Sequence, residues 1–343
     1  MLRNPLAGLL TPAVTVLCFA LISLGGTPAH AADPLPSWNE GATKQAIVDF
    51  VDRATKVDSS EYVPPAERIA TFDNDGTLWC EQPNYIQAEF LIARVKALAA
   101  DHPEWKSQQP HAALLQGDLR DAISGGEQGF ADLITSLHAG QTPEQFQELV
   151  REWFAVARHP RFKRPYNACV YQPMVELLAY LRASGFKTYI VTGGGTDFVR
   201  TVSEQLYEIP PEQVIGSSIR TRFAERNGLF EILRLPKLEF IDYGAGKPIG
   251  IEQFIGRQPR AAFGNSDGDL EMLQWTTAGT NRRPPHLGLL VHHTDAEREY
   301  AYDRQSPIGT LDKALDQAGP RGWTVVDMQR DWKVIFPPAA EGE

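Results

Sequence analysis

The sequence predicts an α/β fold, a Rossmann-like parallel sheet with helices on both faces and an inserted helical cap domain. Short apolar segments alternate with segments of helical periodicity over much of the chain, which is typical of parallel sheets. Polar and glycine-rich turns follow several of the predicted strands. The alternation is interrupted once, by a mainly helical stretch. We therefore expect a core of residues 32–78 and 170–343, with residues 79–169 as the cap over the carboxyl edge of the sheet, where such folds bind ligands.

Composition limits the classes of partner. Of the 343 residues 43% are hydrophobic and 22% charged, which is ordinary for a globular protein. The formal net charge is −10, and nucleic-acid binding needs a basic face. We therefore expect no nucleic-acid partner, while a small anionic substrate remains compatible with a locally cationic pocket.

The first residues resemble an export signal. Arg3 precedes an apolar run that ends near Leu24, and Ala29-His30-Ala31 provides a small-x-small cleavage pattern. Residues 1–31 are thus predicted to be a signal peptide, and the mature protein to be periplasmic or secreted without a stable membrane anchor. The alternative is an uncleaved anchor, but Pro12 and the glycines that follow Leu24 shorten the apolar run.

In the first half of the chain one strand lies among helices. Residues 68–72 are mostly apolar and predict a buried strand that ends at Asp73. Thr142 begins a helix with proline at its first position and Gln145 as a capping-box partner. Helices are expected over residues 40–56, 85–100, 112–138 (broken near Gly125) and 142–158.

The second half alternates strands and helices. Residues 172–183 are amphipathic, and residues 187–191 form an apolar run that leads into a threonine and three glycines. Further strands are expected over residues 214–215, 260–263, 287–291 and 324–326, and further helices over residues 196–207, 248–255, 268–275 and 308–318.

The strongest chemical signal is Asp73-Asn74-Asp75-Gly76-Thr77, directly after the first predicted strand. Two carboxylates two residues apart allow one to attack an electrophile while the other handles a proton. Two close negative charges also favour a bound cation. The structural alternative is an Asx-turn or a helix cap, which Asp-Gly pairs often form.

Three further elements follow in chain order. Thr192 ends the second strand before Gly193 and Gly194, whose backbone N–H groups could hold phosphate oxygens. Lys247 could offset the charge of a nucleophilic carboxylate and a phosphate. Residues 264–269 place oxygen-rich side chains after another strand, which suits magnesium. Each element alone has a structural reading: a glycine-rich turn, a solvated lysine and a capped helix start.

The order of these elements on successive strands resembles the haloacid dehalogenase-like (HAD) hydrolase superfamily, and most closely its phosphoserine phosphatase-like branch with a helical C1-type cap. The resemblance covers roughly residues 69–291. It implies that Asp73 is the nucleophile that becomes phosphorylated. Asp75 is implied to be the general acid and base, with its backbone carbonyl facing a metal. Thr192 then matches the phosphate-binding hydroxyl, and Lys247 the third-motif lysine.

The fourth motif departs from the family. Asn265 and Asp269 match its two acidic positions, but the family usually has aspartate where this chain has Asn265. An amide oxygen can ligate Mg²⁺ without contributing charge. Alternatively, Asp267 supplies the missing carboxylate. The expected metal set is therefore drawn from Asp73, Asp75, Asn265, Asp267 and Asp269.

The resemblance implies a Mg²⁺-dependent phosphatase that hydrolyses a small phosphorylated metabolite through an aspartyl-phosphate. Asp75 fits phosphatases and phosphomutases, whose alcohol leaving group needs a proton. Two alternatives remain: a phosphotransferase or phosphomutase using the same intermediate, and a catalytically impaired HAD-fold binding protein, for which Asn265 is the support.

Weaker features complete the prediction. Glu81 lies just after the first motif and is a candidate substrate-binding residue for a cationic group. Cys80 and Cys169 flank the insertion, where the two crossings between core and cap run side by side, and we hypothesise a disulfide between them. His292 and His293 end a predicted strand and are expected to pack rather than to bind metal, because no third ligand is evident.

Overall fold

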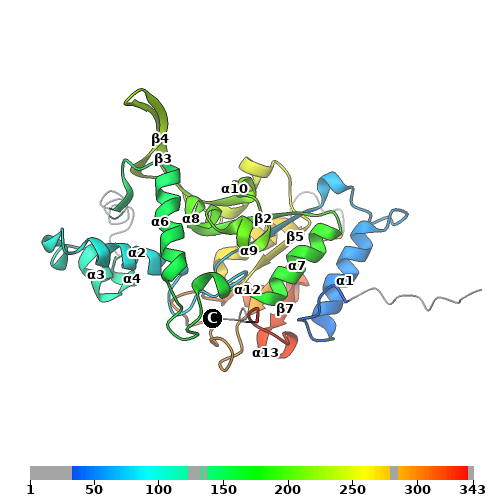
Figure 1. Ribbon diagram of the computed structural model, residues 1–343. Helices are drawn as coiled ribbons and strands as arrows, with labels where there is room; N and C mark the ends of the chain where they lie inside the picture. The colour runs from blue at the N-terminus through cyan, green and yellow to red at the C-terminus, as the bar shows by residue number, and fades with distance from the viewer. Residues whose placement is uncertain (1–32, 123–132, 134–136, 279–284, 339–343) are drawn as a thin grey trace, which may run out of the picture. The chain divides into compact units, whose positions relative to one another are not determined.

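The computed structural model describes residues 33–122, 133, 137–278 and 285–338, and the described residues from Pro34 onward form one compact unit. Its centre is a seven-stranded sheet in the order β4-β3-β2-β1-β5-β6-β7 (Figure 1). The strands are β1 (Ile69–Phe72), β2 (Lys187–Gly195), β3 (Val214–Arg226), β4 (Leu229–Phe240), β5 (Ala261–Gly264), β6 (Leu287–His292) and β7 (Thr324–Asp327).

The sheet is parallel except for β4, which pairs antiparallel with β3. β1 lies between β2 and β5, so that Phe72 is level with Ile190 on one side and Phe263 on the other. The predicted α/β fold class is confirmed. Because the carboxyl ends of parallel strands share one edge, the turns after β1, β2 and β5 come together there.

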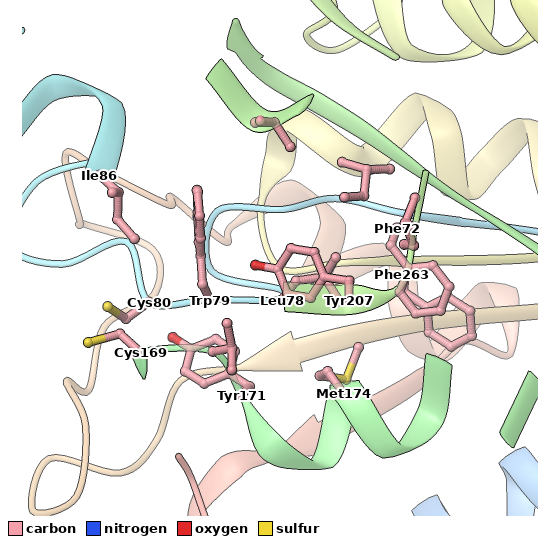
Figure 2. Packing of buried hydrophobic residues seen from close by; sticks show 14 of the residues in the cluster. Phe72, Leu78, Trp79, Cys80, Ile86, Cys169, Tyr171, Met174, Tyr207 and Phe263 are labelled. Carbon is pink, nitrogen blue, oxygen red and sulfur yellow. The ribbon is translucent and has the colours of Figure 1, made fainter. Parts of the chain in front are cut away.

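Alternate residues of the strands enter two separate hydrophobic cores, as the period of a β-strand requires. Ile190 and Phe263 belong to the larger core, whereas Val191 and Ala262 belong to the smaller one. In the larger core the rings of Phe72 and Phe263 stack with centroids 4.2 Å apart (Figure 2). Helices α1 (Ala42–Thr55) and α7 (Gln172–Ala183) contribute to the larger core, and α10 (Gly246–Ile255), α11 (Leu270–Ala278) and α12 (Lys313–Arg321) to the smaller one.

Every regular element that the structure describes between β1 and α7 is a helix, as predicted. The capping box that starts α6 is present, with Thr142 and Gln145 each accepting a hydrogen bond from the other's backbone N–H. The expected break near Gly125 lies outside the described residues, and the division into core and cap domains stays a prediction. The elements are α2 (Ile86–Leu98), η2 (Pro103–Lys106), α3 (His111–Gln116), α4 (Leu119–Ala122) and α6 (Pro143–Val156).

A β-hairpin was missed by the sequence prediction. β3 continues far beyond residues 214–215 and turns at Asn227 and Gly228, both with positive φ, into the unpredicted strand β4. Residues 196–207 form two short helices instead of one, and the last predicted helix begins at Lys313 rather than near residue 308. The remaining elements are η1 (Pro65–Glu67), η3 (Tyr166–Ala168), α8 (Thr196–Arg200), α9 (Ser203–Tyr207), η4 (Pro211–Gln213), η5 (Asp267–Asp269) and α13 (Met328–Asp331).

Cys80 and Cys169 lie side by side (Figure 2), and the Cys80 N–H donates to the Cys169 carbonyl over 3.1 Å. The predicted adjacency of the two crossings is therefore correct. The disulfide itself is absent, because both residues are free, buried cysteines.

The predicted signal peptide lies outside the described residues. Among the described helices, none combines the length and hydrophobicity needed to span a bilayer.

Candidate active site

The loop after β1 folds back on itself. The Asp73 N–H donates to the Phe263 carbonyl over 2.9 Å, which extends the pairing with β5. The Asn74 carbonyl then accepts from the N–H groups of Thr77, Leu78 and Trp79. Gly76 has φ +74°, where a side chain would also collide with Asn265 and Glu81. This tight turn places Asp73 and Asp75 on the wall of a cavity.

Lys247, near the start of α10, contacts the first-motif carboxylate as predicted. Its Nζ donates to Asp73 Oδ1 over 2.5 Å, to Asp269 Oδ1 over 2.6 Å and to the Val191 carbonyl over 2.9 Å. Burial lowers the pKa of Lys247, but Asp269 and Asp73 raise it by more, so the pKa lies above its usual value. Lys247 is therefore a fully engaged ammonium, 2% exposed, that joins the first and fourth motifs.

Asp75 is held by a neighbour that sequence reasoning missed. The Trp79 indole N–H donates to Asp75 Oδ1 over 2.8 Å. Burial raises the pKa of Asp75 to about 6, although the hydrogen bond from Trp79 and the charge of Lys247 lower it. A carboxyl group with this pKa can give up and take back a proton near neutral pH, which is what a general acid and base requires.

The glycines at the end of β2 approach the same place. A Cβ on Gly194 would lie 3.3 Å from Thr192 Oγ1, 3.4 Å from Gln87 Oε1 and 3.6 Å from Asp75 Oδ2. Thr192 Oγ1 accepts from the Gly194 N–H over 3.0 Å, and Gln87 of α2 accepts from the Gly195 N–H over 2.7 Å. Gly193 and Gly194 line the cavity, whereas Thr192 is buried behind them.

The side chains of the 264–269 turn have different hydrogen-bond partners. Asp269 is fully buried, and its Oδ2 accepts from the N–H groups of Asn265 and Ser266 while Oδ1 accepts from Lys247. Asp269 thus shapes the turn and orients the lysine. Asn265 is also buried, and its Oδ1 accepts from Thr77 Oγ1 over 3.0 Å.

The structure does not bring Asp267 to the predicted metal site. Its Oδ1 accepts from the N–H groups of Asp312 and Ala314, and its Oδ2 accepts from the N–H of Lys313. N–H groups at the start of a helix have no carbonyl partner within the helix, so the Asp267 carboxylate caps α12. Asp267 is not among the residues that line the cavity.

The oxygen donors nevertheless suit Mg²⁺. No three His, Cys, Asp or Glu side chains in the described residues form a metal-binding group on their own. Mg²⁺ usually needs only one or two carboxylates, together with water and substrate phosphate. The pKa of Asp73 is raised by burial and then by the charge of Asp269, which outweigh Lys247. A buried carboxylate in such an excess of negative charge favours a cation, so Asp73 on the cavity wall suits the ion.

The cavity has a volume of about 1260 Å³, large for a ligand site. Helices of the insertion and the missed hairpin both supply its walls. Arg234 of β4 pairs with Asp197 and lies over the Phe146 ring, with its guanidinium carbon 4.0 Å from the centroid. The apolar part of the lining includes Leu91, Phe146, Phe198, Ile219, Leu238 and Ile241.

A family model of haloacid dehalogenase-like hydrolases matches residues 70–274, which is more than half of the chain. The chain belongs to this family. The match spans the segments that carry Asp73, Thr192, Lys247 and Asn265, so the resemblance to the HAD superfamily is confirmed, whereas the phosphoserine phosphatase-like branch and the C1-type cap stay predictions. No curated protein sequence matches the chain.

Solved structures resemble this HAD hydrolase at low identity. A conserved protein of unknown function from Anaerococcus prevotii DSM 20548 is 16% identical, with a TM-score of 0.54 over 85% of this chain and 93% of that one. A phosphoserine phosphohydrolase-like protein from Francisella tularensis is 15% identical (TM-score 0.38, 74% and 98% covered). A probable phosphoserine phosphatase from Vibrio cholerae is 18% identical (TM-score 0.38, 77% and 62% covered). The first of these supports the fold.

His293 of this HAD hydrolase packs at the end of its strand, as predicted. His293 is buried and its Nε2 lies 2.8 Å from the Gly76 carbonyl, which can only accept, so Nε2 is the donor. Its Nδ1 lies 3.2 Å from Glu299 Oε2. His293 thereby ties the first-motif loop to the strand end after β6.

Proposed function

We propose that this HAD hydrolase is a Mg²⁺-dependent phosphatase that transfers the phosphoryl group of a small phosphomonoester first to Asp73 and then to water. The observation that carries the proposal is the contact of Lys247 Nζ with Asp73 Oδ1 beside Asp75, on a cavity wall that also includes Gly193 and Gly194. A carboxylate neighboured by an ammonium, a carboxyl group of intermediate pKa and a glycine-rich strand end beside them are the parts that phosphoryl transfer uses.

In the first step an oxygen of Asp73 attacks phosphorus, and the bond from phosphorus to the alcohol oxygen breaks. Asp75 in its protonated form gives its proton to the departing alcohol. In the second step a water molecule attacks the phosphorus of the aspartyl-phosphate, Asp75 takes the proton of that water, and inorganic phosphate and the Asp73 carboxylate are regenerated. Lys247 offsets negative charge at Asp73 throughout.

The metal would be held by the Asp73 carboxylate, the backbone carbonyl of Asp75 and the amide oxygen of Asn265. When bound, it supplies positive charge that reduces repulsion between the carboxylate and the phosphate. Asp269 contributes indirectly, because its Oδ2 fixes the turn that carries Asn265.

The test is turnover of a panel of phosphomonoesters, including a generic aryl phosphate, with Mg²⁺ and with EDTA. We expect Mg²⁺-dependent release of phosphate, and loss by several orders of magnitude in Asp73→Asn. Phosphorylated acceptor appearing when an alcohol is added would favour the phosphotransferase alternative. Folded wild-type protein without turnover of any ester would favour the binding-protein alternative.

We also propose that the protein acts outside the cytoplasm after loss of residues 1–31, on a small phosphorylated metabolite. The support is the charged start, the apolar run and the Ala29-His30-Ala31 pattern. Protein isolated from the exported fraction should begin at Ala32. An intact N-terminus in a membrane fraction would instead indicate the anchor.

A further inference from the structure

Glu81 was predicted, from its place just after the first motif, to bind a cationic group of the substrate. Its side chain is 2% exposed and lines the cavity together with Asp73 and Asp75. Its Oε1 accepts from Tyr302 Oη over 2.8 Å. Gly309 leaves the room that the carboxylate occupies, because a Cβ there would collide with Glu81.

The same carboxylate oxygen is bonded to the residue that departs from the family. Asn265 Nδ2 donates to Glu81 Oε1 over 2.7 Å, while Asn265 Oδ1 accepts from Thr77. These two partners fix which way the amide points. An aspartate at position 265 would bring two carboxylate oxygens to this distance, so an amide at 265 is what a carboxylate at 81 requires.

Glu81 has no cation of its own in the described chain. It forms no ion pair there, and Lys247 is bonded to Asp73 and Asp269 instead. Both hydrogen bonds described for Glu81 end on Oε1, which leaves Oε2 as the oxygen available to a ligand in the cavity.

We propose that Glu81 supplies the negative charge that Asn265 lacks, as the second carboxylate of the divalent-cation site. The pair of Glu81 and Asn265 has a total charge of −1. A pair with aspartate at position 265 and a neutral residue at position 81 would have the same total charge. This inference rests on the proposed Mg²⁺-dependent function and adds a residue to its metal site.

Two substitutions isolate the charge from the packing. In Glu81→Gln the amide oxygen can still accept from Tyr302 and Asn265, so the contacts remain and the charge is lost. In Glu81→Gln with Asn265→Asp the charge returns at position 265, and the hydrogen bond between the two residues forms in the reverse direction. Glu176→Gln is the matched control, because Glu176 accepts from the N–H and Oγ of Ser37 and is not among the residues that line the cavity.

The measurement is Mg²⁺ affinity by calorimetry, with the Mg²⁺-dependent rise in melting temperature as a second readout. We expect Glu81→Gln to bind Mg²⁺ about 10–100-fold more weakly, with a melting temperature in EDTA that is unchanged or higher. The double variant should recover to within about threefold of wild type, and Glu176→Gln should bind Mg²⁺ as wild type does. If Glu81→Gln alone fails to fold, the double variant still decides, because its hydrogen-bonded pair is intact.

Four results would overturn the inference. Wild-type affinity in Glu81→Gln would show that its charge is not used, and a higher KM for cationic substrates alone would return Glu81 to substrate binding. A double variant as weak as Glu81→Gln, or with no Mg²⁺ binding, would show that charge at 265 cannot replace charge at 81. Wild-type protein that does not bind Mg²⁺ would overturn the proposed metal dependence as well, so the two failures are distinguishable.

Discussion

Replacing Trp79 with phenylalanine should move the pH dependence of catalysis without abolishing catalysis. The indole N–H is a hydrogen-bond donor to Asp75 Oδ1, and it favours the ionised form of that carboxyl group. A hydrogen bond to a charged group contributes about 1.5–3 kcal/mol. At about 1.36 kcal/mol per pKa unit, its loss should raise the pKa of Asp75 from about 6 to about 7–8.

The sign follows from the role of Asp75 in the first step. The value of kcat/KM reports the free enzyme up to phosphoryl transfer, which needs Asp75 protonated. In wild type it should therefore fall as pH rises through about 6. In Trp79→Phe the same descent should be centred one to two units higher.

The assay is a pH profile of kcat/KM with an aryl phosphate at saturating Mg²⁺. Trp153→Phe is the matched control, because Trp153 packs against Phe90 and Tyr166 and has no hydrogen bond to Asp75. It should keep the wild-type midpoint. An active Trp79→Phe enzyme whose midpoint also stays near 6 would refute the assignment of Asp75 as the acid that Trp79 controls.

Three other substitutions test separate parts of the structure. Lys247→Met leaves two buried carboxylates without their cation. We therefore expect the free energy of unfolding, measured with urea near neutral pH, to fall by about 3–5 kcal/mol, and turnover to be lost. An unchanged midpoint of urea unfolding would contradict this. Burial, and then the charge of Arg234, lower the pKa of His138 to about 3 in the folded protein. In the unfolded chain the pKa of a histidine is near 6.5. Between pH 6.5 and pH 3 the unfolded state therefore binds a proton that the folded state does not. Between neutral pH and pH 5, His138 should therefore lower the free energy of unfolding of wild type by about 2 kcal/mol, and His138→Phe should not show this loss. An equal loss of stability in both proteins would refute the burial argument. Asp267→Ala removes the acceptor for three N–H groups at the start of α12. The free energy of unfolding should fall by about 1–2 kcal/mol, and Mg²⁺ affinity should not change. A loss of Mg²⁺ affinity would instead restore Asp267 to the metal site.

The sheet could be predicted because most of its strands have a distinct local pattern. β1, β5, β6 and β7 are short segments with many apolar residues, and α7 has the bounds that its periodicity predicts. The β3–β4 hairpin has no such pattern, since Phe223 and Phe230 are 67% and 68% exposed and stack on each other outside the core. Its one local signal is Asn227-Gly228, a dipeptide that favours tight hairpin turns.

The site could be predicted as far as topology determines it. Asp73 and Asn265 each follow a strand and Gly194 lies at the end of another, and parallel strands bring these ends to one edge. The contacts of Trp79 and Gln87 depend on how a loop and α2 fold back over that edge, which no local pattern encodes. Asp267 and Asp269 flank one turn of a 3-10 helix, which sends one carboxylate toward α12 and the other toward Lys247.

The charges around Asp73 determine how substrate and metal must depend on each other. Lys247 already neutralises part of the negative charge of Asp73 and Asp269, so it has little attraction left for an incoming phosphate. Two like charges about 4 Å apart in such a setting repel by about 4 kcal/mol, close to a thousandfold in affinity. A phosphate dianion that approaches Asp73 and Glu81 meets more than one such repulsion. Under the proposed mechanism, substrate binding should therefore be strongly coupled to a divalent cation, and the carboxylate at position 81 would set how tightly that cation is held before the phosphate arrives.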